Sequence, residues 1–371
     1  MTILVFLPTL PAYRKSFLSE VNRKLREAGV SFAVLHGSTS RKTIKETEDC
    51  DFVVKPLVTK ERDFLNSTFT TLALLSKNIE DMNPSGVVFL FNPGILSFWE
   101  GIFYCYRKRI PYGIWSSGYT RPGLSGFKVA VRNYLLNIVY KNASVHICYG
   151  SGHSDYLKLL GIDKSKIFIA QNTINVERII SSTDLNSFQN KYGTELKILF
   201  VGAVIKNKNL KLSMKVIDNL ISKGLNISFT IVGDGEERGN LVEFWNGLRN
   251  REYINIVGSK YGDELNQIFR EAELFLLTGS GGLAINEAMA YGLPVISTYG
   301  DGTVKDLLGD SPLLLHATTE DEVTSRIEYF YSLDRSDKIN IALSNRKSIL
   351  AKASMSNMVD NYLGALSELV K

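Results

Sequence analysis

The chain has 371 residues, of which 44% are hydrophobic and 22% are charged, and its formal net charge is +5. This length exceeds what one hydrophobic core usually supports, and the composition excludes a disordered chain, so we expect two globular domains. The three cysteines are widely spaced without a C-x-x-C pair, so they predict neither a disulfide framework nor a zinc site and favour a reducing, cytoplasmic compartment. No apolar run reaches the roughly 18 residues that a membrane span requires.

The first 175 residues predict a domain in which short apolar strands alternate with helices. This order is typical of a parallel sheet that helices cover on both faces. The strands are expected at Ile3–Leu7, Ser31–Leu35, Val87–Phe91, Tyr112–Trp115, Val145–Cys148 and Ile167–Ala170, with helices between them.

Residues 176–354 predict a second domain of the same kind, because the alternation of strands and helices starts again after a polar stretch. That stretch, Asn175–Thr194, is the best candidate for a linker. The strands of the second domain are expected at Lys197–Val201, Ser228–Val232, Asn255–Val257, Leu274–Leu277, Val295–Ser297 and Leu313–Leu315. The last helices are expected at Glu320–Leu333, Asp337–Ala351 and Asn357–Val370.

The most informative segment, Glu273–Thr298, predicts a strand, a glycine turn, a helix, a second turn and a strand. In the glycine turn, residues 279–282, the backbone can approach a ligand without a Cβ atom in the way. The helix that follows, Leu283–Tyr291, begins with free N–H groups and the positive end of its dipole, an arrangement that binds diphosphate.

One acid, Glu287, lies about a turn and a half into this helix. A carboxylate at that distance from the turn is poorly placed for a phosphate but well placed for the hydroxyl groups of a neighbouring polyol, such as a ribose. The segment therefore predicts a nucleotide site.

The same segment resembles the donor-nucleotide site of the retaining glycosyltransferases of family 4, which have the GT-B fold. Further similarity lies in Leu199–Asn209 (LFVGAVIKNKN), Ile231–Arg238 (IVGDGEER) and Ile256–Leu265 (IVGSKYGDEL). Upstream, Tyr156–Asn175 is similar to the family's stretch before its interdomain linker. Collinear similarity covers residues 145–310.

The resemblance implies two Rossmann-like parallel α/β/α domains that face each other across a cleft. Residues 1–175 would bind the acceptor, residues 176–354 would bind the donor, and a final helix at residues 355–371 would cross back to the first domain. The implied reaction is of the hexosyltransferase type and moves a sugar from a nucleotide diphosphate sugar to an acceptor hydroxyl. It retains the anomeric configuration of the sugar and uses neither a metal nor another cofactor. The implied setting is the synthesis of a bacterial surface polysaccharide or glycolipid, with a saccharide or lipid-linked saccharide as acceptor.

The resemblance also implies the residues of the site. A cation and N–H groups must meet the charge that grows on the diphosphate as the glycosidic bond breaks, and Glu287 would accept hydrogen bonds from the ribose. The candidate donor-binding residues are Gly202, Lys208, Gly279, Ser280, Gly281, Gly282, Leu283 and Glu287, and the candidate catalytic residues are Lys208, Arg14 and Ser117.

Three positions depart from the family pattern. Gly279 stands where the family usually has a glutamate, Ala203 where it usually has an arginine, and Ser117 where it often has a histidine. Replacements are expected from Arg14 in the loop after the first strand, from Arg121, or from one of two histidines, His36 and His153.

Other interpretations of these residues stay open. Gly233, Gly235 and Gly239 narrowly miss the dinucleotide fingerprint, the glycine turn can be purely structural, and Lys208 can be a solvated lysine. Asp49 and Asp51 form a D-x-D, a pattern that can hold a metal. At the level of the whole protein, a nucleotide-sugar epimerase of the same fold and a non-catalytic relative remain the alternatives.

Basic residues are concentrated in the first half, where residues 1–171 hold 22 Lys and Arg against 13 Asp and Glu. Residues 172–371 hold 21 against 25. Between Ile95 and Ser144, seven basic and eleven aromatic residues accompany one acid, Glu100. This segment is either a face that lies on an anionic membrane, on the inner side of the plasma membrane, or an ordinary core with a solvated rim. Nucleic acid is not an expected partner, because no nucleic-acid module accompanies the charge.

Overall fold

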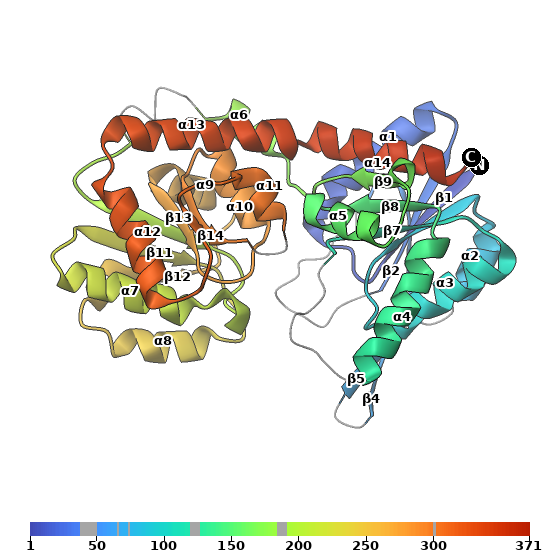
Figure 1. Cartoon of the computed structure of the whole chain (residues 1–371), viewed down its shortest axis with the longest axis horizontal. Helices are drawn as coiled ribbons and strands as arrows, with labels where there is room; N and C mark the ends of the chain where they lie inside the picture. The colour runs from blue at the N-terminus through green and yellow to red at the C-terminus, as the bar shows by residue number, and fades with distance from the viewer. Residues whose placement is uncertain (38–49, 65–66, 73–74, 119–126, 184–190, 300–301) are drawn as a thin grey trace. The chain divides into compact units, whose positions relative to one another are not determined.

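The computed structural model describes residues 1–37, 50–64, 67–72, 75–118, 127–183, 191–299 and 302–371 (Figure 1). The chain divides into two compact units, and each is described by itself. Unit 1 contains Met1–Gln171 and Ser356–Lys371, and unit 2 contains Asn172–Met355. Within the described residues no helix is both long and apolar enough to cross a membrane.

Unit 1 is built on a parallel sheet of seven strands in the order β3-β2-β1-β6-β7-β8-β9. The central strands are apolar on both faces, as a sheet covered by helices on both sides requires. The strands are β1 (Thr2–Leu7), β2 (Ser31–His36), β3 (Val53–Pro56), β6 (Gly86–Leu90), β7 (Tyr112–Ser116), β8 (Val145–Cys148) and β9 (Ile167–Ile169).

Helices cover both faces of this sheet (Figure 1). On one face, Phe17 of α1 packs edge-on against Tyr362 of α14 at 5.1 Å between ring centroids. On the other face, α2, α3, α4 and α5 share one apolar core with the strands. The helices of unit 1 are α1 (Lys15–Glu27), α2 (Leu75–Met82), α3 (Leu96–Lys108), α4 (Phe127–Asn142), α5 (Ser151–Leu159) and α14 (Met355–Leu369), with short 3₁₀ turns η1 (Ala12–Arg14) and η2 (Lys164–Lys166).

The predicted helix between the second and third expected strands is present as α2, but three strands that the sequence did not predict precede it. Here the chain adds β3 to the edge of the sheet and then forms an antiparallel hairpin of β4 (Thr59–Phe64) and β5 (Ser67–Leu72). The sequences TKERDF and STFTTL are rich in threonine and phenylalanine and contain no 3.6-residue apolar period, which explains why strands are favoured.

Unit 2 is built on a parallel sheet of six strands in the order β12-β11-β10-β13-β14-β15. All six predicted strands are present, and no predicted end differs from the observed end by more than one residue. They are β10 (Leu196–Val201), β11 (Ile227–Val232), β12 (Ile254–Gly258), β13 (Leu274–Leu277), β14 (Val295–Thr298) and β15 (Leu314–Leu315). The predicted fold class, two Rossmann-like parallel α/β domains, is confirmed.

The helices of unit 2 follow its strands and enclose a continuous apolar core. They are α6 (Val176–Ser181), α7 (Leu210–Ser222), α8 (Arg238–Asn246), α9 (Gly262–Glu271), α10 (Leu283–Ala290), α11 (Thr303–Leu308), α12 (Glu320–Ser332) and α13 (Arg335–Lys352), with 3₁₀ turns η4 (Lys206–Lys208) and η5 (Arg251–Tyr253). Helix α6 lies inside the stretch predicted as a linker. Asn175 caps it by accepting a hydrogen bond from the Arg178 N–H.

Candidate functional site

The strand order of unit 2 indicates where a ligand crevice is expected. Numbered along the chain within the unit, the strands run 3-2-1-4-5-6, the order of the doubly wound fold. Loops that leave neighbouring strands in opposite directions open a crevice at the carboxyl ends of the first and fourth strands. In this unit those strands are β10 and β13, which are paired directly. The loop after β10 carries Lys208, and the loop after β13 is the glycine turn.

The ammonium group of Lys208 lies in the glycine turn. Its Nζ donates hydrogen bonds to the backbone oxygens of Ser280 at 2.6 Å and of Gly281 at 2.9 Å. The two loops are also joined through their backbones, because the Ser280 N–H donates to the Asn207 oxygen at 2.9 Å. Residues that are 72 and 73 positions apart in the chain therefore form one structure. Lys208 is not a merely solvated lysine.

The amide groups of the turn are not equivalent. The Ser280 N–H is used by Asn207. No backbone acceptor is recorded within the described residues for the N–H groups of Gly281, Gly282 and Leu283. Gly282 caps α10 without a side-chain hydrogen bond. Three N–H groups at the positive end of the helix dipole are thus available for an anion, and Lys208 lies beside them.

The lysine loop lies so close to position 279 that only glycine fits there. A Cβ atom built on it would lie 2.1 Å from the backbone oxygen of Asn207 and 2.6 Å from the backbone of Lys208. The glutamate that the resemblance expects at this position cannot be accommodated without moving that loop. The departure at Gly279 therefore has a structural cause.

We expect Gly279→Ala to lower the free energy of unfolding by about 1–3 kcal/mol, because the methyl group must displace backbone atoms. Gly282→Ala is the matched control. Its Cβ would meet the Lys208 Nζ at 3.6 Å, an ordinary contact, and its backbone is extended. Urea unfolding of both variants measures the difference, and equal stabilities would contradict the tight packing of the two loops.

The loops after β10 and β11 also pack closely against each other at this edge of the sheet. Gly202 has a φ of +156° and Gly233 a φ of +139°, and a Cβ atom on Gly233 would lie 1.8 Å from the Gly202 oxygen. A Cβ atom on Gly235 would lie 2.3 Å from the Val204 oxygen. These glycines let two loops touch at the carboxyl edge of the sheet. That role accounts for two glycines of the near-miss fingerprint.

Glu287 lies on α10 and is half-buried. Within the described residues its carboxylate has no hydrogen bond and no ion pair. Burial raises its pKa to about 7. A desolvated carboxyl group without a partner destabilises the ligand-free protein. Groups of this kind are typical of binding sites, where the ligand supplies the missing partner.

Helix α10 is positioned by residues that the sequence analysis did not select. The Asn286 side chain donates to the Asn172 oxygen at 3.1 Å and the Thr173 hydroxyl at 3.3 Å. The buried Thr278 hydroxyl donates to the Asn209 oxygen at 3.0 Å, and Thr298 donates to the Gly279 oxygen at 2.9 Å. Thr278 directly precedes the glycine turn in the sequence, and this position was a signal for one of these supports.

The strand order of unit 1 reverses between β1 and β6, where a crevice is expected by the same rule, and Arg14 follows β1. Its guanidinium group donates to the Tyr149 hydroxyl at 2.6 Å and lies 4.3 Å from the centre of the Trp115 ring. The side chain is only 5% exposed, its Nη1 has no partner, and no carboxylate pairs with it among the described residues. Such a buried, uncompensated cation is suited to an anionic or strongly polar ligand.

Ser117 follows β7, where the resemblance expects a histidine. The next residue, Gly118, has a φ of +72°, and a Cβ atom on it would lie 2.1 Å from the Nδ1 of His153. His153, on the first turn of α5, therefore reaches the position beside Ser117 from a different element. Burial lowers its pKa to about 4, so the imidazole is neutral at pH 7. The structure thus packs His153 against Gly118, the residue that follows Ser117.

The other residues expected as replacements are not found beside Ser117 among the described residues. His36 ends β2, and its Nδ1 lies 2.8 Å from the backbone oxygen of Gly37. Arg121 and Asp49 lie outside the described residues.

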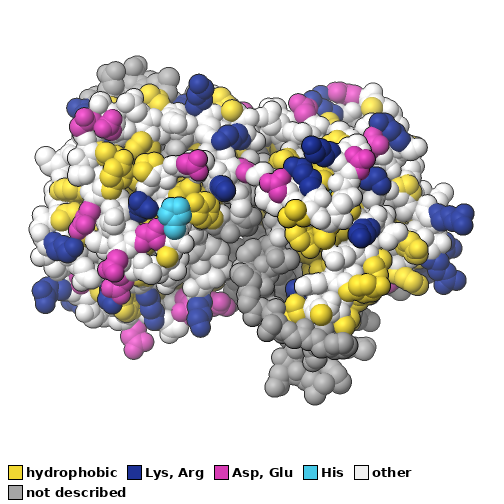
Figure 2. Space-filling view, in the orientation of Figure 1, with side chains coloured by type: hydrophobic (Ala, Val, Ile, Leu, Met, Phe, Trp, Pro, Cys, Tyr) yellow, Lys and Arg dark blue, Asp and Glu magenta, His cyan; other side chains and the backbone are white. Residues whose placement is uncertain are grey.

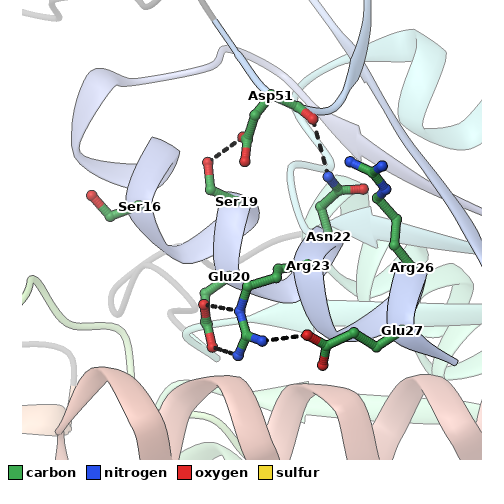
Figure 3. A pocket seen from close by; sticks show the side chains of 8 residues that line it. All are labelled: Ser16, Ser19, Glu20, Asn22, Arg23, Arg26, Glu27 and Asp51. Carbon is green, nitrogen blue, oxygen red and sulfur yellow. Dashed lines mark hydrogen bonds and ion pairs between the residues drawn. The ribbon is translucent and has the colours of Figure 1, made fainter.

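A separate hollow of about 490 Å³ lies beside the polar face of α1 (Figure 3). Asp51, the described half of the D-x-D, accepts a hydrogen bond from Ser19 at 2.5 Å, and its backbone oxygen accepts one from Asn22. Arg23 pairs with Glu20 and Glu27 on the same helix. Most of the polar side chains that line this hollow thus bond to one another. No cluster of three metal-ligating acids, cysteines or histidines occurs in the described part of the chain.

The segment that carries Lys208, the glycine turn and Glu287 matches a known protein family. Residues 182–344 match the family model of the Glycosyl transferases group 1. WcaL of Salmonella typhimurium, a protein named for colanic acid biosynthesis, is 22% identical over 58% of the chain, and the O-antigen biosynthesis glycosyltransferase WbnH of Escherichia coli is 26% identical over 57%. The chain spans about half the length of these relatives, 54% in each case.

Among solved structures, the Anabaena protein Alr3699/HepE in complex with UDP superposes with a TM-score of 0.70. It is 13% identical, and the match covers 99% of both chains. At this identity the likeness concerns the fold alone. The chain therefore has the fold of the GT-B glycosyltransferases, and its residues 182–344, which carry Lys208, the glycine turn and Glu287, match the Glycosyl transferases group 1.

Proposed function

We propose that the protein is a glycosyltransferase that moves a sugar from a nucleotide diphosphate sugar to an acceptor hydroxyl. One observation carries the proposal. Lys208, three free N–H groups and the unpartnered Glu287 lie around one crevice of unit 2, inside the segment that matches the glycosyltransferase family. The relatives' names support a role in the synthesis of a bacterial surface polysaccharide.

The chemistry assigns a role to each part of this crevice. As the bond to the sugar breaks, negative charge grows on the leaving diphosphate, and Lys208 with the N–H groups of Gly281, Gly282 and Leu283 would stabilise it. Lys208 now bonds to two carbonyl oxygens, so it would exchange them for phosphate oxygens. Glu287 would accept hydrogen bonds from the ribose and fix the nucleotide. Gly202, Gly279 and Ser280 would hold the two loops in place.

Unit 1 would bind the acceptor, a saccharide or a lipid-linked saccharide. Arg14 offers a buried, uncompensated guanidinium at its crevice, which suits a polar or anionic group of the acceptor. Ser117 and the neighbouring His153 would orient the acceptor hydroxyl. The basic residues between Ile95 and Ser144 support peripheral contact with an anionic membrane surface, on its cytoplasmic side.

We further propose that transfer proceeds with retention and without a metal, because a fixed cation and helix N–H groups can neutralise the diphosphate. Incubation with radiolabelled nucleotide sugars and a saccharide panel tests the function. We expect acceptor-dependent transfer that survives EDTA, and NMR of the product should show the anomeric configuration of the donor.

Each other outcome contradicts a defined part of the proposal. An altered sugar without any acceptor would mean an epimerase, and no change with any donor would mean a non-catalytic relative. Activity lost in EDTA and restored by manganese would overturn metal independence and direct attention to Asp51.

A further inference from the structure

Helix α4 has two apolar faces, and only one of them packs on unit 1. Leu136, Val139 and Tyr140 recur at helical spacing, are buried, and belong to the core of the unit. A helix on the surface of a globular domain normally buries one apolar stripe and presents polar residues to water. The other face of α4 does not follow this rule.

The outer face of α4 is an exposed apolar stripe. Val131, Tyr134, Leu135 and Ile138 stand at positions i, i+3, i+4 and i+7, and between 41% and 67% of each residue is exposed. Hydrophobic side chains gather along α4 on the face that Figure 2 shows. Single exposed apolar residues need no explanation, but a continuous stripe of them indicates a contact surface.

Helix α3, which shares the core of unit 1 with α4, also exposes large aromatic rings. Phe103 is 65% exposed and Tyr106 is 62% exposed. We name the outer stripe of α4 together with these two rings the outer apolar surface. Tyrosine rings are suited to the boundary of a bilayer, because the ring is apolar and the hydroxyl can stay in water.

Cations stand on the same helical faces as these residues. Arg107 lies one turn beyond Phe103, and Lys141 lies one turn beyond Ile138. Both are exposed, and neither forms an ion pair with a described residue. Lys108, by contrast, pairs with Glu80 at 3.3 Å.

The one acid of this region does not offset those charges. Glu100 accepts hydrogen bonds from the backbone N–H of Ser76 at 3.2 Å and from its hydroxyl at 2.6 Å. Its carboxylate is thus engaged at the start of α2. The cations that adjoin the outer apolar surface are left without a carboxylate of their own.

We propose that the outer apolar surface inserts into the headgroup region of an anionic bilayer, with α4 lying in the membrane plane. The charges beside this surface favour an anionic bilayer over a second copy of the chain as its binding partner. A second copy of the chain would add the same unpaired cations, Arg107 and Lys141, to the contact, whereas anionic lipid offers both an apolar phase and negative headgroups. This proposal rests on the membrane contact proposed above. It adds that the contact is apolar as well as electrostatic.

Sedimentation with phosphatidylcholine vesicles that contain about a quarter phosphatidylglycerol tests the insertion. We expect the wild type to bind, and to keep part of its binding in about 0.5 M salt, where charge attraction is screened. Tyr134→Asp with Ile138→Asp should weaken binding at least about tenfold. Tyr329→Asp with Leu343→Asp is the control, because these residues are 41% and 40% exposed on helices of unit 2, and it should bind as the wild type does.

Tyr134→Trp gives a conservative reporter in case the aspartates disturb folding. Its fluorescence should shift to shorter wavelength with vesicles and be quenched by lipids with brominated acyl chains, and Tyr329→Trp should show neither effect. Aspartate variants that bind like the wild type, or Tyr134→Trp fluorescence that bromine does not quench, would overturn the insertion.

The remaining outcomes separate this inference from the proposed function. A wild type that ignores anionic vesicles at low salt would overturn the membrane contact and the insertion together. Transfer from a water-soluble donor to a saccharide would still be measurable in that case and tests the glycosyltransferase proposal independently. A lipid-free dimer that the aspartates dissociate would identify a second copy as the occupant and would also overturn the insertion.

Discussion

Lys208→Ala should lower kcat for glycosyl transfer by about a hundredfold to a thousandfold, the usual cost of removing one preorganised group that stabilises developing negative charge. Binding of UDP should weaken roughly tenfold to a hundredfold as well, because the lost contacts are charge-assisted hydrogen bonds. Steady-state kinetics and calorimetry measure the two effects. UDP is the probe because the solved neighbour from Anabaena binds it.

Lys206→Ala is the matched control for this prediction. Lys206 opens the same 3₁₀ turn but is exposed, and its ammonium group has no hydrogen bond to a described residue. The control should keep wild-type affinity and rate. Because Lys208 also ties the glycine turn, melting temperatures must show that the variant is folded. Unchanged UDP affinity in folded Lys208→Ala would contradict its assignment to the diphosphate.

Glu287→Gln should make the empty protein more stable at pH 8 while it weakens nucleotide binding. Burial raises the pKa of Glu287 to about 7, so the folded state binds a proton more tightly than the unfolded state does. Stability from this group is therefore full at low pH and is lost as the pH rises through about 7. Glutamine is never charged, and we expect it to add about 1–3 kcal/mol to the free energy of unfolding at pH 8.

Urea unfolding at two pH values isolates this effect. At pH 5 the carboxyl group is largely protonated when folded, and the advantage of glutamine should shrink. Binding of UDP at pH 8 should weaken about tenfold to a hundredfold in Glu287→Gln, since the ribose would lose a charged acceptor. Glu243→Gln, an exposed position on α8, should change neither quantity. Equal stability of Glu287→Gln and wild type at pH 8 would contradict the buried, unpartnered carboxylate.

The local elements could be predicted from the sequence because their signals are local. Apolar strands and glycine turns identify all six strands of unit 2 and the helix that carries Glu287. Charge counts likewise locate the basic region of the first half. The hairpin of β4 and β5 was missed, because short strands that pair only with each other leave no apolar period to recognise.

The parts of the site that depend on distant residues could not be predicted in this way. The contact of Lys208 with the glycine turn requires β10 and β13 to be neighbours, and strand order is set by the packing of whole sheets. The same holds for Gly279, whose lack of a side chain follows from the lysine loop above it.

The sequence by itself thus selected the candidate residues for the chemistry of this protein, and the tertiary structure decided what surrounds them. Glu287 is recognisable as an acid on a helix, but its raised pKa arises from burial by the rest of unit 2. Arg14 is recognisable as a cation after a strand, but its burial against Trp115 and Tyr149 joins three separate elements. The physical reason is that residue type and spacing act along the chain, whereas desolvation and close contact arise only where distant segments pack together.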